Sequence, residues 1–155
     1  MPPLQLQWSN EKNAGFSNGS STWLPVNPNY LWLNVEEQEN SDDEHNTHLG
    51  VYKDVMTVRR LLGTQAQAMF YHTVGDTFIA VTESLVLLLN FAETETIINI
   101  QEILFQHHIF PFLGIVAARS VDGSEQNKFG TPVILISEDI KLAGLEAVLI
   151  KDIFQ

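Results

Sequence analysis

The stretch Gln7–Tyr30, which reads QWSNEKNAGFSNGSSTWLPVNPNY, guides the interpretation of the whole chain. Its Asn-Ala-Gly, Asn-Gly, Leu-Pro and Asn-Pro steps rule out a continuous regular helix or strand. It nevertheless contains four large aromatic side chains, those of Trp8, Phe16, Trp23 and Tyr30. Disordered tails are usually poor in such residues, whereas long irregular loops that carry them often line binding sites. The sequence therefore predicts a structured loop, called the aromatic loop below.

Three further blocks of sequence follow the aromatic loop, and together with it they indicate a family resemblance. They are Asn34-Val35, Val51-Tyr52-Lys53 with Arg59-Arg60, and Leu87-Leu88-Leu89-Asn90-Phe91. With Gln7-Trp8, Asn13-Ala14-Gly15-Phe16-Ser17 and Trp23–Tyr30, they resemble the α-glucosidases (maltases) of the α-amylase superfamily, glycoside hydrolase family 13, in their insect-like form. The agreement is dense over residues 5–60, recognisable at 85–91 and weak beyond residue 100.

This resemblance implies a domain organisation and an activity. In the family, the loop follows the eighth strand of the (β/α)8 catalytic barrel, and an all-β domain comes after the barrel. Residues 1–64 are then expected to form the C-terminal end of the barrel, a loop region and its last helix, and residues 65–155 the C-terminal domain. The implied parent activity is hydrolysis of terminal α-1,4-linked glucose from maltose- or sucrose-like sugars, with retention of configuration.

The aromatic loop lies beside the substrate entrance in the resembled family. Sugars place their C–H faces on aromatic rings while amide groups bind their hydroxyls. By resemblance, Asn13, Phe16 and Trp23 are the residues expected closest to substrate. The alternative is that the aromatic rings only anchor the loop to the barrel. That alternative is preferred for Trp8 and stays open for Phe16 and Trp23.

We predict no catalytic residue within this chain. Retaining glycosidases need a carboxylate nucleophile and a carboxyl acid/base about 5 Å apart. In the resembled family both precede the aromatic loop, and so do the stabilising Asp and the sugar-holding His-Asp pair. Glu36 and Glu37 would point to opposite faces of a strand, and the acids at 42–44 suit a solvated helix start. The chain alone is therefore expected to be inactive.

Two positions depart from the usual wording of the family. Ser9 stands where an acidic residue commonly follows Gln-Trp, and the link Glu83-Ser84 is shorter than in most relatives.

Composition excludes several classes of function. The chain has 155 residues, 45% of them hydrophobic, which argues for one packed core and against disorder. A net charge of −11 disfavours nucleic acid and anionic membranes as partners. The absence of cysteine excludes disulfides and thiolate metal sites. His45 and His48 lie three residues apart and could imitate a metal site with Asp42 or Glu44. Because no further ligand cluster accompanies them and such pairs are common on exposed helices, we predict neither a metal nor a cofactor.

The expected location rests mostly on the resemblance. Residues 1–5 have neither the basic region nor the apolar core of a secretory signal, and the longest aliphatic run, Leu85–Leu89, is too short to span a bilayer. Full-length members of the resembled family are secreted or membrane-anchored. Asn18-Gly19-Ser20 is an N-glycosylation sequon in a predicted surface loop, which makes Asn18 a candidate for glycosylation.

One long helix is expected over residues 42–62. Ser41 followed by Glu44 fits a capping box, and Gly63 is a candidate helix stop. An amphipathic face recurs at helical spacing. Its residues are Leu49, Tyr52, Val55, Met56, Arg59 and Leu62.

Short apolar segments with β-forming residues dominate the remainder. The expected strands are 68–74, 78–82, 85–91, 94–100, 113–117, 133–136 and 147–150, with a tight turn at Gly75-Asp76 and an exposed loop at 120–130. The predicted fold class is mostly β: an antiparallel β-sandwich preceded by an irregular loop region and one helix left over from a (β/α)8 barrel.

Two other functions stay open. The first is a catalytically inactive relative, the heavy chain of an amino-acid transporter, which shares the barrel and tail and acts by binding a partner subunit. The second is a free-standing β-sandwich module that binds sugar by itself. The nucleophile and acid/base positions of the barrel would separate the enzyme from the heavy chain.

Overall fold

The computed structural model describes residues 4–62, 68–121, 123–135 and 139–154. The chain forms two compact units, residues 1–50 and residues 51–155, which are described separately. The boundary between the units falls within the first turn of α2 (His48–Leu62). The domain boundary expected after residue 64 lies in a stretch outside the described residues and stays a prediction.

The first unit is largely irregular, as the turn-rich sequence predicts. It contains the 3-10 helices η1 (Lys12–Gly15), η2 (Pro28–Leu31) and η3 (Glu44–Asn46), the short helix α1 (Val35–Glu39) and the start of α2. Its only buried apolar residue within the described part is Ala14. Hydrogen bonds therefore contribute more to the order of this unit than apolar packing does.

The long helix begins later than predicted. The segment 42–47 forms a turn and η3, and α2 starts at His48. The Thr47 hydroxyl accepts a hydrogen bond from the Gly50 amide at 2.9 Å, the geometry of a helix N-cap. The Ser41 hydroxyl instead accepts from the Asp43 amide in a local turn. The predicted capping box was wrong because Thr47 caps the helix, and the predicted stop at Gly63 lies outside the described residues.

The predicted apolar face of α2 was wrong in part, although Leu62 belongs to the face that packs on the sheet. Tyr52 and Val55 are 62% and 42% exposed, whereas Val58 is 5% exposed. Val58, Leu61 and Leu62 line a pocket with residues of the sheet. The face of α2 that packs on the sheet is thus displaced from the face that the helical spacing indicated.

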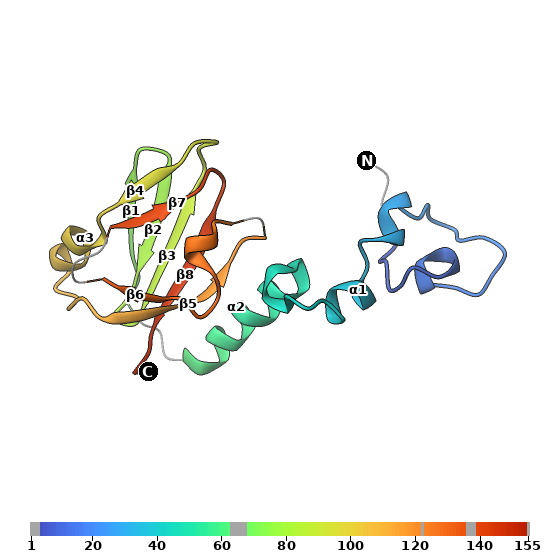
Figure 1. The fold of residues 1–155 in the computed structure, drawn as a ribbon, viewed down its shortest axis with the longest axis horizontal. Helices are drawn as coiled ribbons and strands as arrows, with labels where there is room; N and C mark the ends of the chain where they lie inside the picture. Colours follow the sequence, from blue (N-terminus) through green and yellow to red (C-terminus); the bar gives the residue numbers. More distant parts are fainter. Residues whose placement is uncertain (1–3, 63–67, 122, 136–138, 155) are drawn as a thin grey trace. The chain divides into compact units, whose positions relative to one another are not determined.

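The second unit is built on two antiparallel sheets (Figure 1). The larger has the strand order β1-β2-β3-β8-β5-β6, and the smaller pairs β4 with β7. The strands are β1 (Phe70–Val74), β2 (Thr77–Val81), β3 (Leu85–Asn90), β4 (Thr96–Ile98), β5 (Leu113–Arg119), β6 (Pro132–Ile134), β7 (Ile140–Leu142) and β8 (Ala147–Asp152). Seven strands overlap predicted segments, although the ends differ and residue 136 lies outside the described part.

The first hairpin agrees with its sequence. Val74 pairs with Thr77, so Gly75-Asp76 forms a two-residue turn between β1 and β2. Gly75 has φ 57°, a value that the first position of a hairpin turn of this kind requires and that glycine adopts at low cost.

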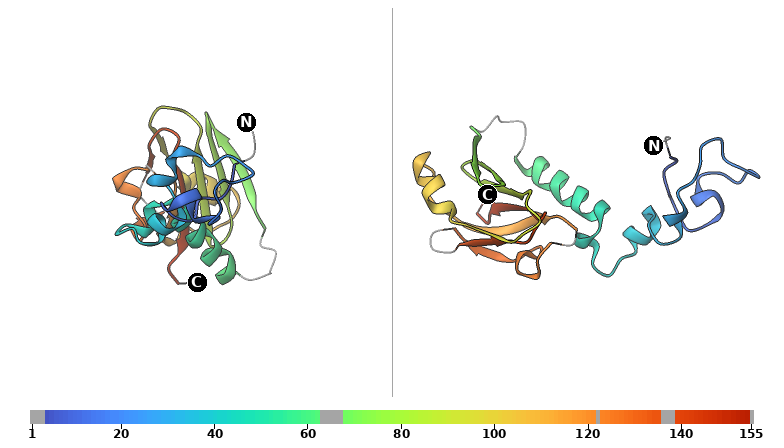
Figure 2. Two further views of the ribbon diagram at one scale, coloured as in Figure 1. Left: turned by 90° about the vertical axis from the view of Figure 1, so that its right-hand side faces the viewer. Right: turned by 90° about the horizontal axis from the view of Figure 1, so that it is seen from above.

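Both faces of the larger sheet carry apolar side chains. Along β3, Val86, Leu88 and Asn90 are buried and alternate with half-buried leucines. The buried face joins β4, β7 and the helix α3 (Ile100–Gln106) in one hydrophobic cluster. On the other side, α2 contributes to pockets with Leu85, Ile115 and Lys151. Figure 2 shows α2 and α3 on different sides of the strands.

In the second unit, the sequence analysis missed one α-helix and one strand. The helix α3 starts after Asn99, whose side chain accepts from the Gln101 amide, and it buries Ile100, Ile103 and Leu104. These residues have helical spacing, but the alternation of Ile98 and Ile100 was interpreted as a strand. The strand β7 has three residues, which are too few for a periodic signal. With 29% helix and 27% strand among the described residues, the fold is mixed rather than mostly β.

The segment 120–130 is anchored rather than freely exposed. It contains η4 (Glu125–Asn127), and Asn127 is buried. The carboxylate of Glu146, which is 2% exposed, accepts from the Ser124 amide at 2.7 Å, the Ala143 amide at 2.7 Å and Asn127 Nδ2 at 3.1 Å. The guanidinium of Arg119 donates to the carbonyls of Gly123 and Ser124. These buried polar contacts hold the segment to the turn before β8.

Candidate functional site

The centre of the aromatic loop is a left-handed turn. Asn13, Ala14 and Gly15 have φ values of 58°, 56° and 67°. The carbonyl of Ala14 accepts hydrogen bonds from the amides of Trp8 at 2.9 Å and Ser9 at 3.2 Å. Non-glycine residues rarely adopt this conformation, and they persist in it where the surrounding contacts over-determine it. The turn thus folds the loop back onto the Trp8-Ser9 segment.

Ser9 packs closely against Gly15, which limits the size of the residue at position 15. A Cβ atom added to Gly15 would lie 2.5 Å from Ser9 Oγ, so no larger residue fits without displacement. The same Ser9 hydroxyl accepts from the Glu11 amide at 3.3 Å. Ser9, which departs from the family wording, therefore belongs to the packing of this turn.

Asn13, a predicted substrate-adjacent residue, has a defined part in the loop. Its Nδ2 donates to the carbonyls of Ser17 and Gly19, each at 2.9 Å. These carbonyls flank Asn18, the exposed residue of the sequon. Both amide hydrogens of Asn13 are thereby used inside the loop, and its contact with substrate stays a prediction.

The aromatic side chains of the loop are open to solvent. Trp23 is 84% exposed, and Phe16 and Trp8 are 47% and 48% exposed. Phe16 follows the left-handed turn directly. Within the described residues, no hydrogen bond or ring contact joins the side chain of Trp23 to that turn. The structure thus brings Asn13 and Asn18 together and leaves Trp23 apart.

A network that the sequence analysis missed closes the ends of the loop. Gln7 Nε2 donates to Asn29 Oδ1 and to the Leu33 carbonyl, both at 2.8 Å. Asn34 is 2% exposed. Its Nδ2 donates to the Tyr30 carbonyl at 2.8 Å, and its Oδ1 accepts from the Glu37 amide at 2.9 Å, which caps α1. Asn34 with Glu37 three residues later is the sequence signal of such a cap.

Backbone pairing completes this closure. The amides of Val35 and Glu36 donate to the carbonyls of Gln7 and Trp8, both at 3.0 Å. Glu36 and Glu37 lie in the first turn of α1, where the positive end of the helix dipole stabilises carboxylates. The strand geometry considered for this pair was wrong, and both side chains are exposed.

In the part of the chain that the structure describes, no group of three or more His, Asp or Glu side chains is arranged to hold a metal ion. His45 Nε2 lies 3.8 Å from the carboxylate of Glu44, its sequence neighbour. The described residues likewise contain no helix long and apolar enough to cross a membrane.

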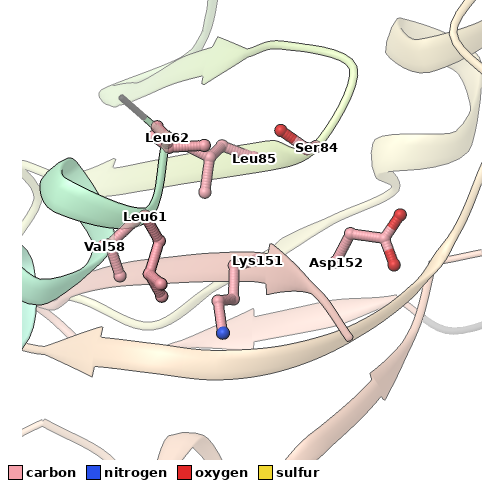
Figure 3. A pocket seen from close by; sticks show the side chains of 7 residues that line it. All are labelled: Val58, Leu61, Leu62, Ser84, Leu85, Lys151 and Asp152. Carbon is pink, nitrogen blue, oxygen red and sulfur yellow. The ribbon is translucent and has the colours of Figure 1, made fainter. Parts of the chain in front are cut away.

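A pocket of about 150 Å³ lies within the second unit (Figure 3). Val58, Leu61 and Leu62 of α2 face Leu85 of β3, with Ser84 and the Lys151-Asp152 pair of β8 around the opening. Leu61 is 64% exposed, so α2 covers this part of the sheet incompletely. A ligand site normally has several polar groups converging on an apolar floor, whereas Figure 3 shows Lys151 and Asp152 pointing in different directions. The pocket is a packing gap, and the aromatic loop is the better candidate site.

Comparison with known families supports the same region. Residues 4–66 match the model of the α-amylase catalytic domain. Maltase 1 of Drosophila virilis is 49% identical over 55 residues, which are 36% of this chain and 8% of that protein. The human amino acid transporter heavy chain SLC3A1 is 30% identical over 107 residues, which are 64% of this chain and 15% of that protein. The chain thus spans less than a sixth of the length of these relatives.

Comparison with solved structures extends over both units. A crystal structure of a trehalulose synthase mutant in complex with Tris aligns with 94% of this chain and 24% of its own, with a TM-score of 0.64 and 16% identity. At this identity the likeness concerns the fold. The matched catalytic-domain segment and the maltase identity support a glucosidase-like assignment within the α-amylase superfamily, and the solved structure shows a shared fold.

Proposed function

We propose that this chain supplies one wall of the sugar site of an α-glucosidase and the C-terminal domain that follows it in the sequence. The observation that carries the proposal is the left-handed turn at 13–15, which holds a fixed loop inside the segment matched to the α-amylase catalytic domain. Rigid loops of this kind place binding groups on a stable scaffold. The parent protein would remove terminal α-1,4-linked glucose from maltose- or sucrose-like sugars with retention.

The proposal includes an α-amylase-type barrel as the partner of this chain. Trp23 and Trp32 are 84% and 69% exposed, and burying a side chain of this size contributes roughly 1.5–3 kcal/mol or more. A barrel would cover such rings and would carry the catalytic carboxylates. Residues 1–155 alone are then inactive, because the residue pair that performs retaining hydrolysis belongs to the barrel.

A chromogenic α-glucoside tests both parts of this proposal. We expect turnover by the longer protein that includes the barrel, and none by residues 1–155 at any concentration. In the longer protein, Trp23→Ala and Phe16→Ala should raise KM, because they remove apolar surface from the sugar site. Trp32→Ala is the matched control for loss of an indole that the barrel covers, and it should leave KM unchanged. Turnover by residues 1–155 alone would contradict the assignment of catalysis to the barrel.

The C-terminal part is proposed to be a β-sandwich domain over residues 65–155. The hydrophobic cluster contains Val86 and Leu88 of the larger sheet and Ile98, Ile140 and Leu142 of the smaller one, as expected of two sheets that share a core. An experimental structure would test this proposal through the angle between the two sheets. Sheets packed face to face keep their strand directions within about 30° or near 90°.

A transporter heavy chain is the second candidate. The similarity to SLC3A1 extends over 107 residues, compared with 55 for Maltase 1, and therefore reaches into the β unit. This candidate predicts that the parent barrel lacks the nucleophilic Asp or the acid/base Glu. It also predicts that the protein co-purifies with a membrane transporter subunit. An intact carboxylate pair with glucosidase turnover would exclude it.

A free-standing sugar-binding module is the third candidate, and it makes the opposite prediction for residues 1–155. If the chain were such a module, maltose titrated into residues 1–155 would change the fluorescence of Trp23 with saturation. Under the α-glucosidase proposal we expect no saturable change up to millimolar sugar, because residues 1–155 supply only one wall of the proposed site. Saturable binding that Trp23→Ala removes would favour the module.

We also propose that the parent is extracellular or membrane-anchored and that Asn18 is glycosylated. Asn18 is exposed in a loop, as glycosylation requires. Expression through a secretory pathway should give a product whose mass falls on enzymatic deglycosylation. Asn18→Gln should abolish that shift, and Asn10→Gln, which lies outside a sequon, should retain it.

A further inference from the structure

His72 and His107 meet in the second unit although 35 residues separate them in the sequence. Their Nε2 atoms lie 2.6 Å apart, and their ring centroids are 4.8 Å apart at 62°. Both side chains are half-buried, so each is held by protein yet accessible to solvent. Neither residue belongs to the aromatic loop or to the matched catalytic-domain segment.

Three features of the fold position this pair. His72 lies on β1, an edge strand of the larger sheet. Phe70 lies on the same strand two residues earlier and therefore on the same face. The ring of His107 stacks on Phe70 with centroids 4.0 Å apart and planes at 16°. His107 also ends α3, where its amide donates to the carbonyls of Leu104 and Phe105.

The facing Nε2 atoms leave room for one proton between them. Two neutral imidazoles can share a hydrogen bond only if one ring carries its proton on Nε2 and the other on Nδ1. When the first ring moves its proton to Nδ1, both Nε2 lone pairs point at the same region. Two imidazole nitrogens that converge on one point form a chelate for a transition metal.

We propose that His72 and His107 form a binding site for a divalent late transition cation, with Cu²⁺ bound most tightly. Metal–nitrogen bonds of about 2.0–2.1 Å place two nitrogens about 2.9 Å apart at a right angle and about 3.3 Å apart at a tetrahedral angle. The observed 2.6 Å is shorter than both separations, so the rings must move apart on binding. The right-angled arrangement, which Cu²⁺ prefers, requires the smaller movement, about 0.3 Å. Water completes the coordination. A shift from Nε2–H to Nδ1–H frees the site without net loss of a proton from the neutral pair.

Calorimetric titration of Cu²⁺ into residues 1–155 tests the proposal. His45→Gln/His48→Gln provides the background, because these histidines form a second pair three residues apart. In that background we expect one equivalent to bind at pH 7.5. His72→Gln or His107→Gln should weaken binding at least tenfold, since loss of even an outer-shell partner typically costs about 10–100-fold. His108→Asn is the matched control, because His108 has φ 57°, which asparagine tolerates.

A second measurement on the wild-type chain avoids dependence on the variants. Substoichiometric Cu²⁺ should broaden the NMR signals of His72 and His107 before those of other residues in the second unit, and Ca²⁺ should leave them unchanged. Circular dichroism would establish that each variant is folded. Equal binding by His72→Gln and the background protein, or broadening centred away from both rings, would overturn the proposal.

Discussion

The two units of this chain are ordered by different interactions. In residues 1–50, Ala14 is the one buried apolar residue of the described part, and Trp23 and Trp32 are largely exposed. In residues 51–155, a hydrophobic cluster of fifteen buried residues joins both sheets and α3. The first unit depends on caps, turns and amide networks, whereas the second buries a continuous core.

The two units differ in how much apolar surface they bury with their own residues. A folded domain must bury enough apolar surface to offset the conformational entropy that it loses. The second unit does this with its own residues, whereas the first presents large exposed rings. The region with the clearest family resemblance is therefore also the region for which we propose a covering partner.

The largest effect should come from the core of the second unit. Ile98→Ala should lower the free energy of unfolding by about 2–5 kcal/mol, because Ile98 is 2% exposed and its removal leaves a cavity. Ile97 is the matched control on the same strand and is 61% exposed. Ile97→Ala should cost no more than about 1 kcal/mol. Chemical denaturation of both variants measures the difference, and equal losses would contradict the assignment of this core.

A second test concerns the polar anchor of the same unit. Glu146→Gln should cost about 1–3 kcal/mol, because an amide group cannot accept from all three donors that the carboxylate satisfies. Glu93→Gln removes a charge from an exposed carboxyl and should change stability little. Thermal unfolding compares the two. A loss confined to Glu93→Gln would show that the anchor is unimportant.

The stability of the turn in the aromatic loop should depend on the glycine at position 15. Gly15→Ala should destabilise the turn by about 1–2 kcal/mol, because alanine at φ 67° is strained and its Cβ would approach Ser9 Oγ. Gly19→Ala is the control, since Gly19 lacks a positive φ and the sequon is retained. Hydrogen exchange at the Trp8 amide, which bonds to Ala14, reports the opening of the turn. Unchanged exchange in Gly15→Ala would refute its proposed rigidity.

The smallest effect is electrostatic. A hydrogen bond from Lys128, whose Nζ lies 2.5 Å from Glu125 Oε2, holds the pKa of Glu125 below its usual range. Its stabilising contribution is therefore present above the pKa of the unfolded carboxyl and is lost as pH falls through the lowered pKa. Lys128→Met should raise the pKa of Glu125 in an NMR titration, with little change in unfolding because the pair is exposed. Concentrated salt should reduce the shift in the wild type.

Local chemistry made parts of the fold predictable. Gly75-Asp76 indicates a hairpin because glycine supplies the positive φ, and the Leu85–Leu89 run indicates a strand with two apolar faces. By contrast, α3 was hidden because Ile98 and Ile100 also fit strand alternation. The cap at Thr47 was missed because Ser41 offered a competing motif. The buried face of α2 was misassigned because the packing of the fold, rather than helical spacing, decides that Val58 is buried and Tyr52 is exposed.

The sequence by itself indicated the family, through residues of the aromatic loop, because a motif is a local feature that can be recognised without knowledge of contacts. It also determined most strands and the absence of cysteine chemistry. Only the tertiary structure decided that Asn13 clamps the sequon turn, that Glu146 is buried and that His72 meets His107. The burial of Glu146 and the contact between the two histidines depend on residues far apart in the chain, whose distance is fixed by sheet pairing and core packing. The contacts of Asn13 are local, but they depend on a left-handed backbone turn that sequence spacing does not reveal.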